Sequence, residues 1–216
     1  MLRIFLLLLV LGHFTYLKVF ACAKVALNIG HVVDQDGVRL KTGANLEKGT
    51  DITTGPSSLV KLILIDDSII DLGSSSHLKL TACEGKNWET RINLDLKKGS
   101  IRALVNKAPR KKREVFELKT ETSVLAVRGT EFFVSWQENK AGQVVEQIGV
   151  SEGRVEVRSL FDDASKPITL TTGTEFVAEG RIEKVRGEIK VEATSPPRVD
   201  QFSGDEQRQA ELNRIN

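Results

Sequence analysis

The chain has 216 residues, enough for one sizeable domain or two small ones. Its 31 Lys and Arg residues nearly balance its 29 Asp and Glu residues, and Arg3 and Lys18 both lie in an apolar N-terminal segment. Without that segment the formal charge is zero. A neutral chain lacks the basic excess that a general nucleic-acid or anionic-membrane binder needs, so we expect no nucleic acid among its partners.

Residues 1–23 are predicted to be a secretory signal peptide. Arg3 gives the positive start, residues 4–12 are uninterrupted apolar sequence, and Ala21-Cys22-Ala23 offers an A-x-A cleavage pattern. A signal anchor is the weaker alternative, because Lys18 interrupts the apolar run well short of the roughly 20 residues that a membrane span needs. We therefore expect an exported protein. A periplasmic location is favoured, and secretion is an alternative.

The two cysteines are Cys22 and Cys83. Cleavage after Ala23 leaves Cys83 alone, so no internal disulfide is expected, and a lone thiol in an exported protein is either buried and inert or available for an intermolecular bridge. We favour burial. A second interpretation treats residues 19–22 as a loose lipobox with a lipidated Cys22, although Phe20 fits such a box poorly. Membrane attachment is expected only in that case, and Cys83 has no partner there either.

From residue 24 to residue 194 the chain consists of short apolar or alternating segments separated by turn signals, with no convincing amphipathic helix. This pattern predicts an all-β domain over residues 24–194. The predicted strands cover residues 29–33, 37–40, 59–65, 69–72, 77–80, 91–96, 100–105, 114–119, 124–128, 132–136, 144–150, 154–160, 168–170, 175–178, 181–185 and 188–191. Residues 81–89 have no firm assignment.

Two kinds of turn recur along these strands. The acidic turn at residues 66–68 lies between two apolar segments and predicts a hairpin. Four other turns place an apolar residue three positions before a glycine: Leu46 and Gly49, Leu96 and Gly99, Val150 and Gly153, Leu170 and Gly173. Their irregular spacing differs from a fixed-period repeat, so we interpret them as one device, a glycine turn between short strands, used several times.

The most apolar segment after residue 24 is residues 118–136, and it alternates with a period of two on both sides of Gly129. An isolated glycine inside a strand pattern indicates a bulge, a sharp bend or a close backbone approach. Arg128 and Glu131 flank this position. They are predicted to form a structural pair across the bend, and the alternative is that Arg128 contacts a ligand or a partner.

This segment resembles the signature of the FecR domain family, T-P-x-A-V-x-G-V-R-G-T-E-F. The matching positions are Thr120, Val124, Val127, Arg128, Gly129, Thr130, Glu131 and Phe132, of which residues 127–132 form one continuous run. Three positions depart from the family pattern. Glu121 stands where the family has proline, Ser123 where it has alanine, and Ala126 where it has glycine.

The resemblance covers about residues 28–192 and implies a twisted solenoid-like or sandwich-like stack of short strands. In the best-known members of the family this domain lies in the periplasm, behind a membrane helix and a cytoplasmic anti-sigma segment. There it receives a signal from an outer-membrane transporter during iron uptake. Here only the predicted signal peptide comes before the domain, so no cytoplasmic sigma factor is expected as a partner.

The sequence carries weak candidates for chemistry. Residues 149–153 match the G-x-S-x-G nucleophile pattern around Ser151, but a strand follows and no histidine lies beyond His77, so a hairpin turn is expected there. His31, His77 and Cys83 have no metal-ligand spacing. The aspartates at 34, 36, 66, 67 and 71 are interpreted as turn acids, not as a calcium site. No catalytic residue, metal or cofactor is predicted.

One basic cluster is a possible partner patch. It comprises Lys107, Arg110, Lys111, Lys112 and Arg113. Such a cluster can hold phosphate or anionic polymers, although a solvated loop is its usual role. After Pro196 and Pro197, residues 195–216 are polar and are predicted to form a disordered tail with at most a short, marginal helix. A tail that docks on a partner is the alternative.

Two functional hypotheses follow. The first is a non-enzymatic, extracytoplasmic protein-interaction or signal-sensing module that binds an envelope protein through strand edges or the basic cluster. The second is a carbohydrate- or cell-wall-binding domain, which exposure of Trp88 or Trp136 would favour and burial of both would weaken. A hydrolase built on Ser151 ranks far below both.

Overall fold

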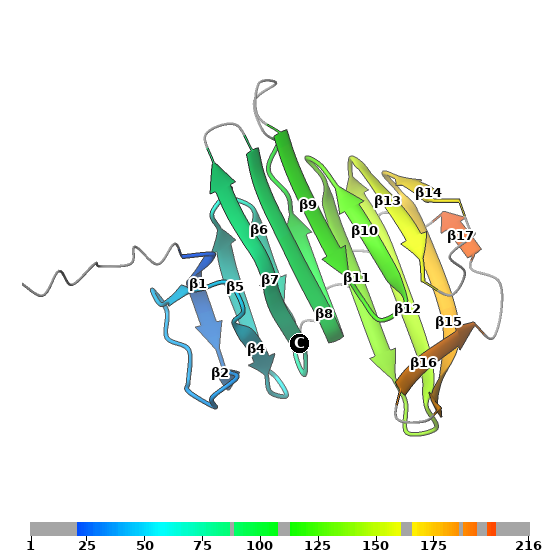
Figure 1. Cartoon of the computed structure of the whole chain (residues 1–216), viewed down its shortest axis with the longest axis horizontal. Helices are drawn as coiled ribbons and strands as arrows, with labels where there is room; N and C mark the ends of the chain where they lie inside the picture. The colour runs from blue at the N-terminus through cyan, green and yellow to red at the C-terminus, as the bar shows by residue number, and fades with distance from the viewer. Residues whose placement is uncertain are drawn as a thin grey trace, which may run out of the picture.

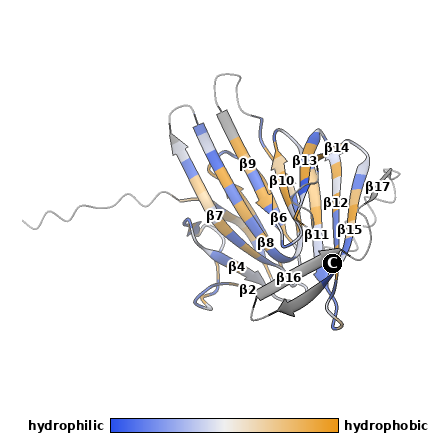
Figure 2. Ribbon diagram, turned by 45° about the vertical axis from the view of Figure 1, so that its right-hand side comes forward, coloured by the Kyte–Doolittle hydropathy of each residue, from blue (hydrophilic) through white to orange (hydrophobic). Residues whose placement is uncertain are grey.

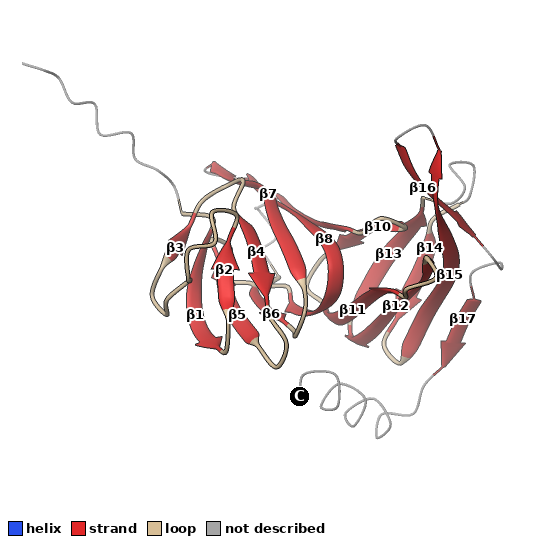
Figure 3. Cartoon of the chain, turned by 90° about the horizontal axis from the view of Figure 1, so that it is seen from below, coloured by secondary structure: helices blue, strands red, loops and turns tan. Residues whose placement is uncertain are grey.

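The computed structural model describes residues 21–86, 89–107, 113–160, 166–185, 188–193 and 198–201. Within these ranges every regular element is a strand (Figure 3). None of the described residues forms a helix long and apolar enough to cross a membrane. The all-β prediction is confirmed.

The strands pair into two sheets that share one strand. Sheet A runs in the order β3 (Asn45–Leu46), β1 (Ala23–Ile29), β5 (Leu59–Leu64), β6 (Ile69–Leu72), β8 (Glu89–Leu104), β11 (Glu131–Glu138), β12 (Gln143–Glu152) and β15 (Thr174–Val185), and β15 also pairs with β16 (Glu188–Ala193) and β17 (Arg198–Gln201). Sheet B runs in the order β2 (Val32–Asp34), β4 (Asp51–Thr54), β7 (His77–Lys86), β8, β9 (Arg113–Lys119), β10 (Ser123–Val127), β13 (Arg154–Ser159) and β14 (Ile168–Thr171). The stack advances along its long axis in chain order (Figure 1).

The shared strand, β8, corrects one prediction. The sequence indicates two strands at residues 91–96 and 100–105 with a turn between them, whereas the structure has one strand. Residues up to Lys98 pair with β7 in sheet B, and Gly99 already pairs with Trp136 of β11 in sheet A. Gly99 has a φ of +93°, and this conformation lets the backbone pass from one sheet to the other.

The other glycine turns are also corners between sheets. Gly49 lies between β3 and β4, Gly153 between β12 and β13, and Gly173 between β14 and β15, and each connection changes sheet. The hairpin turn predicted at residues 149–153 is therefore wrong, because β12 and β13 lie in different sheets. Glycine turns recur along the chain as predicted, but their role is different. Each of them leads the chain from one sheet to the other.

The core lies between the two sheets and forms a single cluster of apolar side chains. Each strand contributes every second residue to this cluster, because successive side chains point to opposite faces. On β7 and β8 this alternation is visible as orange and blue bands (Figure 2). The fully buried side chains include Leu62, Ile70, Leu78, Leu94 and Phe132. The predicted hairpin between β5 and β6 is confirmed, with Ile63 opposite Ile69.

Both ends of the chain differ from the prediction. Strand β1 begins at Ala23, inside the predicted signal peptide, and Gly30 separates it from β2 where one strand was expected over residues 29–33. Strand β17 occupies residues 198–201 of the predicted tail and pairs with the first residues of β15. Val199 is the single apolar residue of β17, so the segment lacks the alternation of apolar and polar residues that indicates a strand. Residues 202–216 lie outside the described ranges.

Candidate functional site at the signature corner

Residues 127–132, here called the signature corner, connect β10 in sheet B with β11 in sheet A. Gly129 adopts a φ of +57°, so the predicted bend is present. The Thr130 hydroxyl accepts a hydrogen bond from the Arg154 N–H at 3.1 Å and donates one to the Arg154 carbonyl at 2.8 Å. A Cβ on Gly153 would lie 2.9 Å from the Gly129 carbonyl oxygen. Thr130 thus joins the signature corner to the next one along the stack.

The side chains that follow Thr130 have structural partners. Glu131 forms an ion pair with Arg102 of β8, whose Nε lies 3.0 Å from Glu131 Oε1. Phe132 is fully buried and packs edge-on against Phe116, with ring centroids 6.4 Å apart. The predicted pair between Arg128 and Glu131 is wrong, because the carboxylate lies over sheet A and bonds to the neighbouring strand.

Arg128 instead lines an open hollow of about 560 Å³ on the outer side of sheet B. The hollow brings together three cationic side chains, those of Lys107, Arg128 and Arg154, and one carboxylate, that of Glu156. Lys107 packs over the corner, because its Cβ lies 3.0 Å from where a Cβ on Gly129 would be. The wall is completed by Ala126, Val127, Gly129, Gly153 and Thr171. We call this feature the cationic hollow.

The charges in the cationic hollow are not neutralised by the described part of the chain. Neither Arg128 nor Arg154 nor Lys107 forms an ion pair with any residue in the described ranges. Two other lysines on sheet B are paired: Lys79 with Asp51 at 2.8 Å, and Lys97 with Asp95 at 2.9 Å. Three cations around one carboxylate leave a local positive excess that favours an anionic group.

The first residue of the signature, Thr120, acts at the opposite end of β10. It lies in the turn between β9 and β10 and donates a hydrogen bond from its hydroxyl to Glu146 Oε1 at 2.6 Å. Ser123 Oγ donates to Glu146 Oε2 at 2.5 Å. Glu146 belongs to β12 in sheet A, so this network ties the two sheets together.

Two of the three departures from the family pattern supply hydrogen-bonding groups. Ser123 supplies a hydroxyl to Glu146 that the usual alanine cannot supply. Glu121 accepts a hydrogen bond from Lys97 Nζ at 3.1 Å, which a proline cannot do. Burial by itself would lower the pKa of Lys97, but the hydrogen bonds with Asp95 and Glu121 outweigh it, and the pKa is raised. Ala126 is exposed and lines the cationic hollow.

Burial raises the pKa of Glu146, against the opposing effect of the hydrogen bonds from Ser123, Thr120 and Thr122. A carboxyl whose pKa is higher in the folded state than in the unfolded state costs no stability below the unfolded value of 4.5. As the pH rises above that value, the unfolded state releases its proton first and the folded state loses stability.

We therefore expect the Glu146→Gln variant to have a flatter pH dependence than the wild type. Between about pH 4.5 and the folded-state pKa, the wild type should lose up to about 1.4 kcal/mol per pH unit relative to the variant. Urea unfolding of both proteins between pH 4 and pH 8 measures this difference. A constant difference across the series would mean that Glu146 is ionised in the folded state.

The remaining candidate residues are placed as follows. Of the basic cluster, only Lys107 has a described side chain and lies in the cationic hollow; residues 108–112 lie outside the described ranges, and Arg113 is the first residue of β9. Ser151 is part of β12 and is followed by a strand, so the strand-to-helix context of the nucleophile motif is missing. Trp136 is buried at 3 % exposure, which weakens the carbohydrate hypothesis, while Trp88 lies outside the described residues.

The aspartates at 34, 36, 66 and 67 lie at or in turns as predicted, whereas Asp71 lies in β6 and forms an ion pair with Lys61. Asp34 Oδ1 accepts the N–H groups of Asp36 and Val38, at 3.0 and 2.9 Å, and Asp66 accepts that of Ser68 at 3.0 Å. In the part of the chain that the structure describes, no three His, Cys, Asp or Glu side chains are grouped to hold a metal ion. The residue that sequence reasoning missed is Arg154. The sequence feature that could have indicated Arg154 is the glycine next to it. Gly153 and Arg154 form an adjacent glycine-arginine pair, as Arg128 and Gly129 do in the signature.

The comparison with family models agrees with the sequence resemblance. The family model described as FecR protein matches residues 50–156, from β4 to the middle of β13. No curated protein matches the chain. Two crystal structures of a candidate anti-sigma factor from Parabacteroides distasonis are similar, at 17 % identity and a TM-score of 0.46 in both cases. The match covers 66 % of this chain and 59 % of theirs.

The matched range contains the signature corner and the corner glycines Gly99, Gly129 and Gly153. It also contains all four charged residues of the cationic hollow. The Arg, Gly, Thr, Glu and Phe of the signature occupy positions that the structure explains one by one. Residues 50–156 of this chain are a FecR domain.

Proposed function

We propose that this protein is a non-enzymatic, extracytoplasmic interaction module of the bacterial envelope that binds an acidic, extended segment of a partner protein. The observation that carries the proposal is the cationic hollow beside the FecR signature. Lys107, Arg128 and Arg154 converge there from three different segments of the chain, and they have no ion-pair partner among the described residues. Arginine is well suited to carboxylate recognition because its planar fork can bind both oxygens.

The neighbouring strand edge favours an extended partner. Strand β14 ends sheet B, and in the described ranges it pairs with β13 alone. Thr171 of β14 lies opposite Arg154 and also lines the hollow. A partner segment that adds to this edge would form main-chain hydrogen bonds, and its alternate side chains would face the hollow. Carboxylates at those positions would meet Arg154 and Arg128.

The location is supported by two independent features. The N-terminal segment has the composition of a signal peptide, and the structure joins Cys22 to Cys83 in a disulfide. Disulfides persist in oxidising compartments such as the periplasm and are rare in the cytosol. Both features favour export. A FecR domain that senses or transmits the binding of an envelope partner fits this location.

Site-specific photo-crosslinking in the source bacterium tests the proposal. A photoreactive phenylalanine analogue at Ala126, on the wall of the hollow, should give a discrete adduct with an envelope protein. Arg154→Glu should reduce the yield of this adduct at least tenfold, because it replaces a cation in the hollow with a carboxylate, which repels the acidic segment. A tenfold change corresponds to about 1.4 kcal/mol of binding free energy.

Arg158→Glu is the matched control. Arg158 is exposed on the same strand, β13, and on the same face as Arg154, but it does not line the hollow. The control should leave the adduct unchanged. Equal loss of the adduct in both variants would mean that the overall charge of the surface, and not the hollow, determines binding. The absence of any protein adduct at Ala126 would refute the proposed site.

A further inference from the structure

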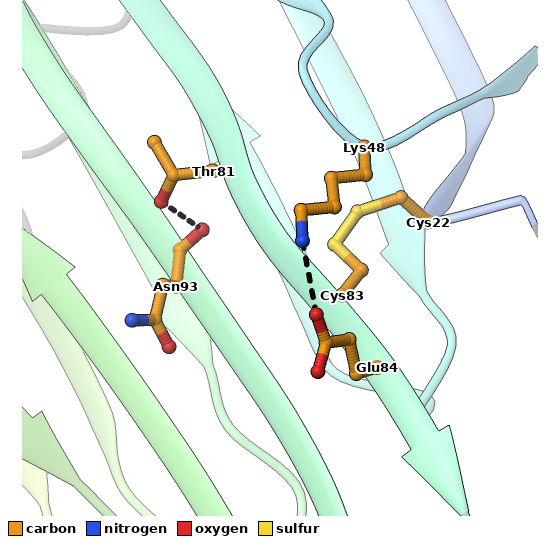
Figure 4. Close-up of a disulfide and its surroundings, with 6 residues drawn as sticks. All are labelled: Cys22, Lys48, Thr81, Cys83, Glu84 and Asn93. Atoms are coloured by element: carbon orange, nitrogen blue, oxygen red, sulfur yellow. Dashed lines mark hydrogen bonds and ion pairs between the residues drawn. A yellow bond between two sulfur atoms is a disulfide. The ribbon is translucent and has the colours of Figure 1, made fainter.

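The structure assigns a role to Cys22 that the predicted signal peptide boundary does not allow. Cys22 is bonded to Cys83 of β7, and their Cα atoms lie 5.2 Å apart, within the range of about 4.4–6.8 Å that disulfides span. The expectation that Cys83 has no partner is therefore wrong. Figure 4 shows the bond between Cys22, which directly precedes β1, and Cys83 of β7, beside the ion pair of Lys48 with Glu84.

Cys22 and Ala23 belong to the folded domain. They are 1 % and 2 % exposed, and both are part of the apolar core. The Cys22 N–H donates to the Leu46 carbonyl at 2.6 Å, and the Cys22 carbonyl accepts from the Ile65 N–H at 3.1 Å. Cleavage after Ala23 would remove both residues, these hydrogen bonds and the partner of Cys83.

We propose that the signal peptide is removed after Ala21, so that the mature chain begins with Cys22 and its N-terminus is held by the disulfide. Hydrolysis of the Ala21–Cys22 peptide bond leaves a small residue before the cut, as leader peptidases require, with Val19 at the outer position of the A-x-A-like pattern. The new amino group can still donate to the Leu46 carbonyl. Every contact of Cys22 and Ala23 with the domain is kept.

The disulfide also bears on lipidation. A lipoprotein carries its diacylglycerol on the Sγ of the N-terminal cysteine, and this sulfur cannot form a thioether and a disulfide at the same time. When the disulfide forms, the two thiols lose two protons and pass two electrons to the disulfide of an exported thiol oxidoreductase, which becomes a dithiol. The proposal therefore makes this protein a lipid-free, disulfide-closed module, independently of what its hollow binds.

Intact-mass analysis of the full chain, expressed with its own signal peptide in a bacterial host with an oxidising periplasm, tests the proposal. The expected mass is that of a chain that starts at Cys22 and contains the disulfide, which is two hydrogen atoms lighter than the dithiol form. Iodoacetamide should modify no cysteine before reduction and two after it. A chain that starts at Lys24, with Cys83 alkylated without reduction, or a diacylated Cys22 would overturn the proposal.

The Ala23→Val variant separates the two cleavage sites even if folding is affected, because processing precedes folding. Valine at position 23 should leave cleavage after Ala21 intact, and it should block cleavage after position 23, where a small residue is required. In the Cys83→Ser variant the mature chain should still start at Cys22 and carry one thiol that is alkylated without reduction. Accumulation of uncleaved Ala23→Val precursor would contradict the proposal.

Discussion

Replacement of Gly99 by alanine should lower the free energy of unfolding by about 3 kcal/mol or more. Two effects add at this position. A non-glycine residue in the left-handed region costs about 1–2 kcal/mol, and the φ of Gly99 is +93°. In addition, a Cβ on Gly99 would lie 2.0 Å from Ser76 Oγ and 2.5 Å from Ser76 Cα, so the backbone at Ser76, in the corner between β6 and β7, must move. Overpacking of this kind costs about 1–3 kcal/mol.

Gly49→Ala is the matched control for this prediction. Gly49 has the same φ of +93° and also follows a leucine by three positions, but a Cβ there would meet nothing within 4 Å. Its cost should be the conformational part alone, about 1–2 kcal/mol. Urea unfolding of the two variants gives the difference between them, which measures how closely the corners stack. Equal losses would show that the corners do not pack against each other.

Loss of the disulfide is the second large effect. Cys83→Ser should lower the free energy of unfolding by about 4 kcal/mol, because the bond closes a loop between cysteines 61 residues apart and restricts the unfolded chain. The change is measured by urea unfolding of the purified mature protein under non-reducing conditions.

Two further proteins control for side-chain effects. The wild type in a reducing agent and the Cys22→Ser, Cys83→Ser double variant should both be destabilised by about the same amount as Cys83→Ser. Substitution of either cysteine is sufficient to remove the bond. The losses in free energy of unfolding caused by the two single substitutions should therefore not add. A double variant that is much less stable than the single one would mean that the buried cysteine side chains, and not the bond, provide the stability.

Sequence patterns were sufficient for the fold class and for most strands, because the alternation in β5, β6, β9 and β13 directly reflects burial between two layers. They were insufficient for the connections. A glycine with positive φ looks alike in a hairpin and in a corner between sheets. The sequence therefore indicates a break at Gly99 and a hairpin at Gly153, whereas the structure has one continuous strand, β8, and a corner between sheets. Which sheet a strand joins depends on partners far away in sequence.

The candidate site was half predictable. Arg128 and Lys107 could be named as charged residues of interest, but only the stacking of corners brings them together with Arg154. The partner of Glu131 could not be read from local spacing, because Arg102 is 29 residues away and on a strand reached through the shared sheet. The cysteine pairing was missed for a different reason. The Ala21-Cys22-Ala23 pattern indicates a cut after Ala23, and such a cut removes Cys22, the partner of Cys83.

We infer that the signature has two separate roles: Thr130 holds the corners together, and Arg128 serves partner recognition. One comparison tests it, namely unfolding stability and Ala126 crosslinking measured side by side in Arg128→Glu and Thr130→Val. We predict that Arg128→Glu stays within about 0.5 kcal/mol of the wild type and loses the adduct at least tenfold. Thr130→Val should lose about 1–3 kcal/mol, because the Arg154 backbone groups lose their hydrogen-bond partner, and should keep the adduct while folded. An Arg128→Glu variant that is as unstable as Thr130→Val and still forms the adduct would contradict the claim.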